Sequence, residues 1–345
     1  MMMAIPTNLQ DWREYVAREP QRPDHLSARE LKALTASALD AYNETRFAWL
    51  SADTVLATPD VQQLRRLWAT LRAETLYGTN TAAKLMSVSG APTSGKTTAA
   101  LWIARDHERT ERHRHPTRPP DQLQPSLYVV TPPATTPKML LIAFCNVLGL
   151  PHVRASTAQD LIERVHAILR TLQTSLIVLD EVHNVQSNRQ IGAEAASTLK
   201  LFAERLDCAF ILNGIDLDRS PVFAGTVGEQ LASRTIRYDI RGYRYNSAQA
   251  REEWGELLVS CGDLLPLARQ SDEVFADAAA WLFEVTGGSI GRLRSLLRRT
   301  AIDAITSGRE RVTMADMEVF ANQGGHSRKP ASGPRAARDL DAASA

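Results

Sequence analysis

The stretch GAPTSGKT, from Gly90 to Thr97, is the most informative motif in this chain. It fits the pattern G-x-x-x-x-G-K-[ST] of a phosphate-binding loop. The apolar run at 85–88 predicts a short buried strand before it, and the run TAALWIA predicts a helix after it. In that context the glycines let the backbone curl, so that successive N–H groups and the helix N-terminus face a polyphosphate. The alternative is a glycine turn that happens to end in Lys-Thr; the flanking strand and helix favour a nucleotide site.

The residues of this stretch have different expected contacts. Lys96 is expected to reach the β- and γ-phosphates, and the Thr97 hydroxyl is expected to bind Mg²⁺. We therefore expect ATP and Mg²⁺ as cofactors. The predicted cofactor-binding residues here are Gly90, Ala91, Pro92, Thr93, Ser94, Gly95, Lys96, Thr97 and Thr98.

Composition excludes some classes of protein. The chain has 345 residues and a formal net charge of +1, so any DNA contact must come from a local patch, repeated by oligomerisation. The three cysteines are scattered in apolar segments, which favours buried free thiols in a reducing compartment over a metal site. The N-terminus lacks a signal-peptide pattern, and no apolar run approaches the ~20 residues of a membrane span. We expect a cytoplasmic protein with no membrane partner.

Strands alternate with helices after the loop, which predicts an α/β fold with a parallel sheet and a ligand at its carboxyl edge. The later strands are predicted at 127–130, 175–181, 209–214 and 235–240. Beyond them the pattern is helical, at 247–260, 272–285, 289–306 and 314–321. The predicted organisation is an N-terminal helical extension at 1–55, a three-layer αβα nucleotide-binding core at 56–243, a small helical lid at 244–322 and a disordered tail at 323–345.

A hydroxyl residue followed three residues later by an acid or amide predicts a helix start. The first such pair is expected to open one helix that continues through Leu39. The three candidate pairs are Ser27 with Glu30, Ser156 with Gln159, and Thr313 with Asp316.

Two other segments carry open alternatives. The three histidines within 106–120 suggest a metal site, but Pro and Arg crowd the segment and favour a solvated loop. The segment 58–61 is a candidate for part of an adenine pocket, against plain helix packing.

The apolar strand at 175–181 ends in Asp180 and Glu181, which is the strongest sign of hydrolysis. Asp180 is expected to hold Mg²⁺ through water, and Glu181 to polarise the attacking water. His183 follows closely, either as a functional residue or as a loop residue hydrogen-bonded locally.

Three more residues are candidate catalytic groups. Asn213 ends the next strand and is expected to hydrogen-bond the water or the γ-phosphate; the alternative is a plain Asn-Gly turn. Arg292 is expected to fold back over the nucleotide, and Arg234 to act on the ATP of a neighbouring subunit, with Arg237 as the next candidate. For these arginines the alternative is a solvated surface charge.

In this order the landmarks resemble an AAA+ ATPase. GAPTSGKT resembles the family's Walker A motif and LIVLDE its Walker B motif. Asn213 resembles sensor 1, Ser233-Arg234 resembles an arginine-finger box, and GGSIGR with Arg292 resembles sensor 2. The resemblance covers about residues 55 to 320 and implies ATP hydrolysis by an oligomer.

Within that class the chain looks most like the TniB/TnsC-type transposition regulators of Tn7-like and Mu-like transposons. The suggestive stretches are AYNETR with a later Trp, TPP at 131–133, and DEVHN at 180–184. The resemblance implies self-assembly as a ring or helical filament on duplex DNA, recruitment or stimulation of a DDE transposase, and a target-selector protein as a further partner. The candidate DNA contacts are Thr135, Thr136, Lys138 and Arg189, in two loops expected at the carboxyl edge.

Other functions stay open at this point. A helicase-loader or origin-binding AAA+ protein would share the core, though the short tail leaves no room for a DNA-binding domain after the lid. A signalling NTPase of the defence type would normally carry repeats or an effector domain. A nucleotide-dependent scaffold with little turnover is the third alternative, and Glu181 argues against it.

Overall fold

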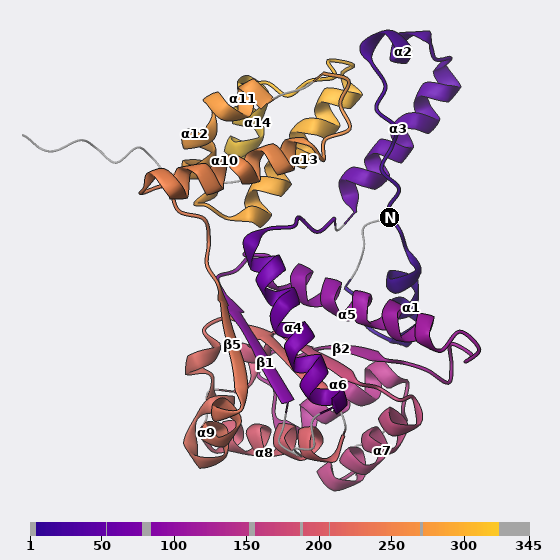
Figure 1. Cartoon of the computed structure of the whole chain (residues 1–345), viewed down its shortest axis with the longest axis vertical. Helices are drawn as coiled ribbons and strands as arrows, with labels where there is room; N and C mark the ends of the chain where they lie inside the picture. The colour runs from indigo at the N-terminus through magenta and orange to yellow at the C-terminus, as the bar shows by residue number, and fades with distance from the viewer. Residues whose placement is uncertain are drawn as a thin grey trace, which may run out of the picture.

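The computed structural model describes residues 5–52, 54–77, 84–151, 156–186, 189–206, 208–269 and 272–323. Its centre is a parallel sheet of five strands in the order β2-β3-β4-β1-β5 (Figure 1). Because neighbouring strands all pair in parallel, their carboxyl ends meet at one edge of the sheet. The strands are β1 (Lys84–Gly90), β2 (Ser126–Val130), β3 (Leu176–Asp180), β4 (Ala209–Gly214) and β5 (Thr235–Ile240).

Helices cover both faces of the sheet, which makes the core three-layered as predicted. Every residue of β3 is buried, as expected of a strand covered on both sides. One face packs against α1 (Leu9–Ala17), α4 (Pro59–Tyr77) and α5 (Lys96–Arg114). The other packs against α6 (Pro137–Leu148), α7 (Ala158–Thr171), α8 (Arg189–Arg205) and α9 (Gly225–Ser233). Three short 3₁₀ helices connect elements, η1 (Val182–Asn184), η2 (Leu217–Arg219) and η3 (Pro221–Phe223).

The C-terminal helices form a lid with its own apolar core, which includes the buried side chains of Trp254, Leu282, Leu293 and Met317. Figure 1 shows them gathered beyond one end of the sheet. The lid consists of α10 (Ala248–Gly262), α11 (Asp272–Asp277), α12 (Ala279–Thr286), α13 (Ile290–Thr306) and α14 (Met314–Gln323).

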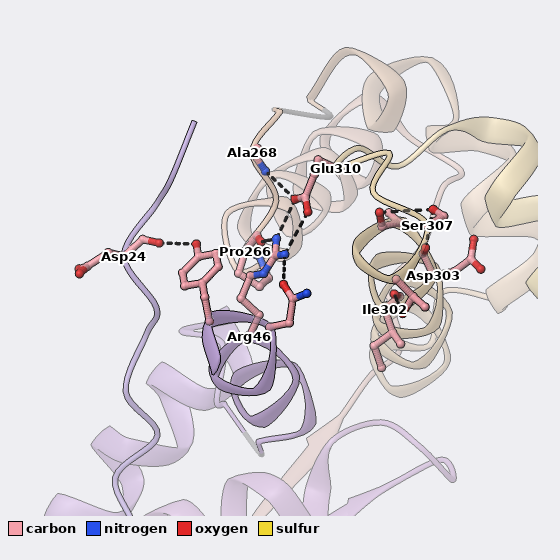
Figure 2. Close-up of polar contacts among 12 residues, drawn as sticks. Asp24, Arg46, Pro266, Ala268, Ile302, Asp303, Ser307 and Glu310 are labelled. Atoms are coloured by element: carbon pink, nitrogen blue, oxygen red, sulfur yellow. Dashed lines mark hydrogen bonds and ion pairs between the residues drawn. The ribbon is translucent and has the colours of Figure 1, made fainter. Parts of the chain in front are cut away.

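The segment expected as an N-terminal extension divides between the two parts. Helix α1 buries Trp12, Tyr15 and Val16 against the sheet. Helices α2 (Ala28–Ala33) and α3 (Ala36–Ser51) lie beside the lid, and Leu50 of α3 belongs to the lid core. A buried Arg46 of α3 bonds to the lid, as Figure 2 shows. The helices within residues 1–55 therefore pack against two different parts of the molecule.

Several local predictions were wrong. The helix expected to continue through Leu39 breaks at Leu34, which has extended backbone angles, and Thr35 caps the new helix α3. The start of α7 is capped by the pair Thr157 and Asp160 rather than by Ser156 and Gln159, a shift of one residue. The predicted lid helix at 272–285 is two helices, α11 and α12.

The segment at 106–120 is only partly a loop, because α5 continues to Arg114. Its His107 is buried against Trp68, so apolar packing explains this histidine. In the described parts of the chain no group of three or more His, Cys, Asp or Glu side chains could hold a metal ion.

Other predictions were right. Ser27 with Glu30 forms a capping box, and Thr313 exchanges hydrogen bonds with Asp316 at the start of α14. The thiols of Cys145, Cys208 and Cys261 are buried, and none of the three forms a disulfide. The tail beyond Gln323 lies outside the described residues. Among those that are described, no helix is both long and apolar enough to span a bilayer.

Candidate active site

The loop from Gly90 to Thr97 leaves β1 at the carboxyl edge and enters α5. A side chain at Gly90 would bring a Cβ to 2.7 Å from the Ile240 carbonyl oxygen, so the neighbouring strand requires glycine there. Gly95 has φ of +94°, in the left-handed region that glycine adopts without strain. Gly95 is also the N-cap of α5 and no side chain caps this helix, so its first N–H groups are available to an anion.

Lys96 lies at the base of the loop and is 7 % exposed. Its Nζ donates to the Ala91 carbonyl oxygen at 2.8 Å, which holds the loop closed around the ammonium group. Burial lowers the pKa of Lys96, while the carboxylates of Glu181, Asp180 and Asp239 oppose that shift. The ammonium group is thus placed where a phosphate could replace a carbonyl as its partner.

Asp180 ends β3 and is 2 % exposed. Its Oδ1 accepts from Asn213 Nδ2 at 2.6 Å and from the Glu181 backbone N–H at 2.8 Å. Its Oδ2 accepts from the Tyr128 hydroxyl at 2.6 Å. Three donors therefore fix the orientation of this carboxylate. Sequence reasoning missed Tyr128 because the sequence of β2 shows only the pattern of a buried strand.

Glu181 adopts a left-handed conformation with φ of +57°, which turns the chain sharply after β3. Its carboxylate is 3.2 Å from His183 Nε2. His183 Nδ1 accepts from the Ile215 backbone N–H at 3.3 Å, which leaves Nε2 as the ring nitrogen that faces Glu181. The imidazole of His183 therefore lies close to the Glu181 carboxylate.

Three polar atoms around this edge are buried and have no hydrogen-bond partner: Ser94 Oγ, Thr131 Oγ1 and Asn213 Oδ1. A buried polar atom without a hydrogen bond lowers stability unless a ligand or a water molecule supplies the partner. Thr131 directly follows β2, and its N–H donates to the Asp180 carbonyl oxygen at 2.9 Å, so its backbone lies next to the end of β3. With Lys96 and Thr97, these donors and acceptors fit a magnesium-bound triphosphate and an attacking water. Sequence reasoning missed Thr131.

Beside the loop lies a pocket of about 160 Å³ between the core and the lid. Its walls are largely apolar and include Val61, Ile240 and Ile290. Thr58 and Asp60 also line it, so the segment suspected of an adenine contact does border the pocket. Burial raises the pKa of Asp60, and its Oδ1 accepts from the Tyr238 hydroxyl at 2.6 Å. A purine base attached to phosphates on the loop would fit here.

The lid touches the loop directly. Ser289 Oγ lies 2.8 Å from Thr93 Oγ1, and the Gly291 N–H donates to the Thr93 carbonyl oxygen at 3.1 Å. Arg292 is exposed and is not among the described residues that line the pocket, whereas Arg294 two positions later lines it. The role predicted for Arg292 stays a prediction, and Arg294 is a second candidate that sequence reasoning missed.

Arg234 and Arg237, the two candidates for an arginine finger, are surface residues. Arg234 follows α9, its side chain is 43 % exposed, and its Nη1 lies 3.7 Å from Glu204. Arg237 in β5 is 48 % exposed and pairs with Asp218 at 3.0 Å. Neither reaches the phosphate side of its own subunit in a described contact, and the role toward a neighbouring subunit stays a prediction.

The four residues predicted to contact DNA have different environments in the structure. Thr135 is fully buried and its hydroxyl donates to the Pro132 carbonyl oxygen, so it does not face solvent and the prediction of a DNA contact there was wrong. The Thr136 side chain caps α6 by accepting from the Met139 N–H. Lys138 is half-buried in the first turn of α6. Arg189 begins α8, and its side chain lies outside the described residues.

A scan against protein families matches residues 46–242 to the family described as bacterial TniB protein. This chain belongs to the TniB family. The match spans the loop, the carboxylate pair, Asn213 and Arg234 of this TniB protein, and it ends before the lid. No curated protein sequence matches significantly.

Solved structures resemble this TniB protein in fold. The ORC2 protein of Aeropyrum pernix, in ADPNP and ADP complexes, is 16 % identical with a TM-score of 0.58, over 80 % of this chain and 71 % of that one. The ORC1 protein of the same organism, in complex with DNA, is 16 % identical with a TM-score of 0.54, over 81 % and 69 %. Domain III of the Thermotoga maritima replication initiation protein DnaA is 12 % identical with a TM-score of 0.51, over 79 % and 94 %. The fold is that of the AAA+ ATPases, with the parallel sheet and helical C-terminal part that the motifs predicted.

Proposed function

We propose that this TniB protein hydrolyses ATP with Mg²⁺ and assembles on duplex DNA in its ATP-bound state. Through this assembly it marks target DNA and recruits or stimulates a DDE transposase, with a target-selector protein as a possible further partner. One observation carries the ATPase part of the proposal. Lys96, the Asp180–Glu181 pair and three unpartnered polar atoms converge at one edge of the sheet, beside a pocket that a base would fit.

The residues have separate parts in the reaction. The N–H groups at the start of α5 and Lys96 bind the phosphates. Thr97, and Asp180 through water, would hold Mg²⁺, which when bound would neutralise charge on the phosphate oxygens. Glu181, oriented by His183, accepts a proton from water, whose oxygen bonds to the γ-phosphorus. The bond from the γ-phosphorus to the bridging oxygen breaks, and ADP and phosphate leave.

Two further groups complete this site in the proposal. Asn213 keeps Asp180 in place through Nδ2 and offers its free Oδ1 to the water. Arg234 of a neighbouring subunit brings positive charge to the γ-phosphate in the transition state. A finger supplied by a neighbour makes hydrolysis depend on assembly.

The DNA part of the proposal rests on the family and on charge. A nearly neutral chain binds duplex DNA weakly as a monomer, but an oligomer repeats the same cations along the phosphate backbone. Lys138 and Arg189 follow β2 and β3 in the chain and are the cations proposed for this contact. The related ORC1 protein was solved in complex with DNA, which supports this part by analogy of fold only.

The test of the ATPase proposal uses two variants. Lys96→Ala is expected to abolish binding of a fluorescent ATP analogue, because it removes the cation on the β/γ-phosphates. Glu181→Gln is expected to bind the analogue as the wild type does and to hydrolyse ATP about 10²–10⁴-fold more slowly, since only the proton acceptor is lost. Equal turnover by wild type and Glu181→Gln would refute the role of Glu181.

The test of the DNA proposal is an anisotropy titration on random-sequence duplex with ATP, ADP or no nucleotide, across a salt series. We expect binding only with ATP, little sequence preference and a steep loss of affinity with salt. Electron microscopy of the ATP complex shows whether the assembly is a ring or a filament. Affinity that does not depend on ATP, or no binding at low salt, would favour a signalling NTPase instead.

A further inference from the structure

Tyr128 lies in the middle of β2, outside every motif described above. Its side chain is 2 % exposed, and its hydroxyl donates to Asp180 Oδ2 at 2.6 Å. In the parallel register Tyr128 is opposite Val178, two residues before Asp180, so its hydroxyl reaches along the sheet toward the carboxyl edge. Of the three donors on this carboxylate, Tyr128 is the one that meets Oδ2.

The ring of Tyr128 is held by the N-terminal helix α1. Trp12 stacks on it with ring centroids 6.3 Å apart and planes 8° apart, and Tyr15 stacks on Trp12 at 5.5 Å. Arg109 of α5 secures the end of α1, because its Nε and Nη2 donate to the Val16 carbonyl oxygen at 2.9 and 2.8 Å. A chain of packed groups thus joins α1 to the carboxylate.

We propose that Tyr128 is a positioning residue for Asp180 and that α1, through Trp12, is part of the nucleotide site. This inference rests on the proposed ATPase function. A buried carboxylate oxygen without its donor is free to rotate toward another partner, and a water-mediated contact with Mg²⁺ depends on that orientation. Removing the Tyr128 hydroxyl therefore weakens the use of Mg²⁺ and leaves the loop's own phosphate contacts in place.

The experiment is a MgCl₂ titration of fluorescent ATP-analogue binding, with an EDTA arm. In Tyr128→Phe the affinity in EDTA is expected to equal that of the wild type, and the Mg²⁺ midpoint to rise about three- to tenfold. Tyr42→Phe is the matched control, because it also removes a hydroxyl that donates at 2.6 Å, there to the Asp24 carbonyl oxygen beside the lid. Its Mg²⁺ midpoint is expected to stay unchanged.

Two further measurements separate positioning from general loss of structure. In an Asp180→Asn background, adding Tyr128→Phe is expected to produce no further shift, because the hydroxyl acts only through that carboxylate. Trp12→Phe keeps a ring on Tyr128 and is expected to keep the wild-type midpoint, whereas Trp12→Leu is expected to raise it. Thermal unfolding of each variant shows whether it is folded. If Tyr128→Phe does not fold, the comparison of Trp12→Phe with Trp12→Leu provides the test.

The outcomes distinguish the two proposals. Binding by the wild type that ignores Mg²⁺ would overturn the proposed ATPase site and the inference with it. Normal Mg²⁺-dependent binding by the wild type, with the same midpoint in folded Tyr128→Phe, would overturn the inference alone. A raised midpoint that is additive with Asp180→Asn would overturn the positioning role of Tyr128.

Discussion

Arg46 and Glu310 form a buried, bidentate ion pair across 264 residues of sequence, with Nη1 2.7 Å from Oε2 and Nη2 3.0 Å from Oε1. Arg46 is 1 % exposed and also donates to the Pro266 carbonyl oxygen and to Asn43. The Tyr42 ring lies 4.8 Å below the guanidinium group. Figure 2 shows how the pair joins α3 to the loop before α14, so that α3 and the lid form one body.

We expect Arg46→Met to lower the free energy of unfolding of the lid by about 3–5 kcal/mol, because it leaves a buried carboxylate without a partner. The double variant Arg46→Met/Glu310→Leu is expected to recover most of that loss, since no charge is then left uncompensated. Urea denaturation followed by tryptophan fluorescence measures both. Lys200→Ala removes a partly exposed pair on α8 and serves as the control, with an expected change within about 0.5 kcal/mol. A loss in Arg46→Met no larger than in this control would contradict the structural role.

The contact of Gly291 with the loop sets the distance between lid and nucleotide site. An added Cβ at Gly291 would lie 2.8 Å from the Thr93 carbonyl oxygen and 3.0 Å from Thr93 Cβ, so Gly291→Ala must push α13 away. We expect binding of the ATP analogue to weaken by about 1–3 kcal/mol. Gly255→Ala in α10 meets nothing within 4 Å and is the control, with unchanged affinity and slightly higher stability. Equal affinities in both variants would mean that the lid does not close on the loop.

If Arg234 acts on a neighbour's ATP, Arg234→Ala should lose hydrolysis and cooperative assembly yet keep ATP binding by the monomer. Its only described ion pair, with Glu204 at 3.7 Å, is exposed and loose, so the side chain can leave it at little cost. Mixing Arg234→Ala with Lys96→Ala is expected to restore some activity at hybrid interfaces. No rescue at any ratio, with normal assembly of Arg234→Ala, would transfer the role to Arg237.

Acid should destabilise the core through His107. Burial lowers the pKa of His107 from 6.5 to about 4, and its Nε2 lies 2.8 Å from Ser175 Oγ. Between those pH values the unfolded chain binds the proton and the folded chain does not, so stability falls as pH drops from about 6.5 to about 4. Once the unfolded chain is fully protonated at this histidine, the free energy of unfolding has fallen by about 3 kcal/mol. Denaturation across this range should show a flatter pH dependence in His107→Phe than in the wild type, whereas exposed His25→Gln should follow the wild type. If the free energy of unfolding changes with pH equally in His107→Phe and in the wild type, this prediction is contradicted.

Elements predicted from consecutive residues agree with the structure where the pattern is local. The loop at 90–97, the strand that ends in Asp180 and the strand at 209–214 that carries Asn213 were placed correctly because apolar runs and glycines act on their own backbone. The breaks at Leu34 and Ala278 were missed, since apolar spacing alone does not show where a chain must turn to pack. The cap of α7 is Thr157 and not Ser156, because apolar spacing does not show at which residue the helix begins either.

The amino-acid sequence alone was enough to predict the class of fold, the loop that faces a phosphate and the carboxylates at the sheet edge. These depend on residue types at fixed spacing, and a short motif specifies its own backbone conformation. The packed structure was needed to show that Tyr128 and Thr131 lie beside Asp180, that Arg294 rather than Arg292 lines the pocket, and that the N-terminal segment divides between core and lid. Those relationships join residues far apart in the chain, and side-chain packing between separate elements fixes them without leaving a pattern in either stretch alone.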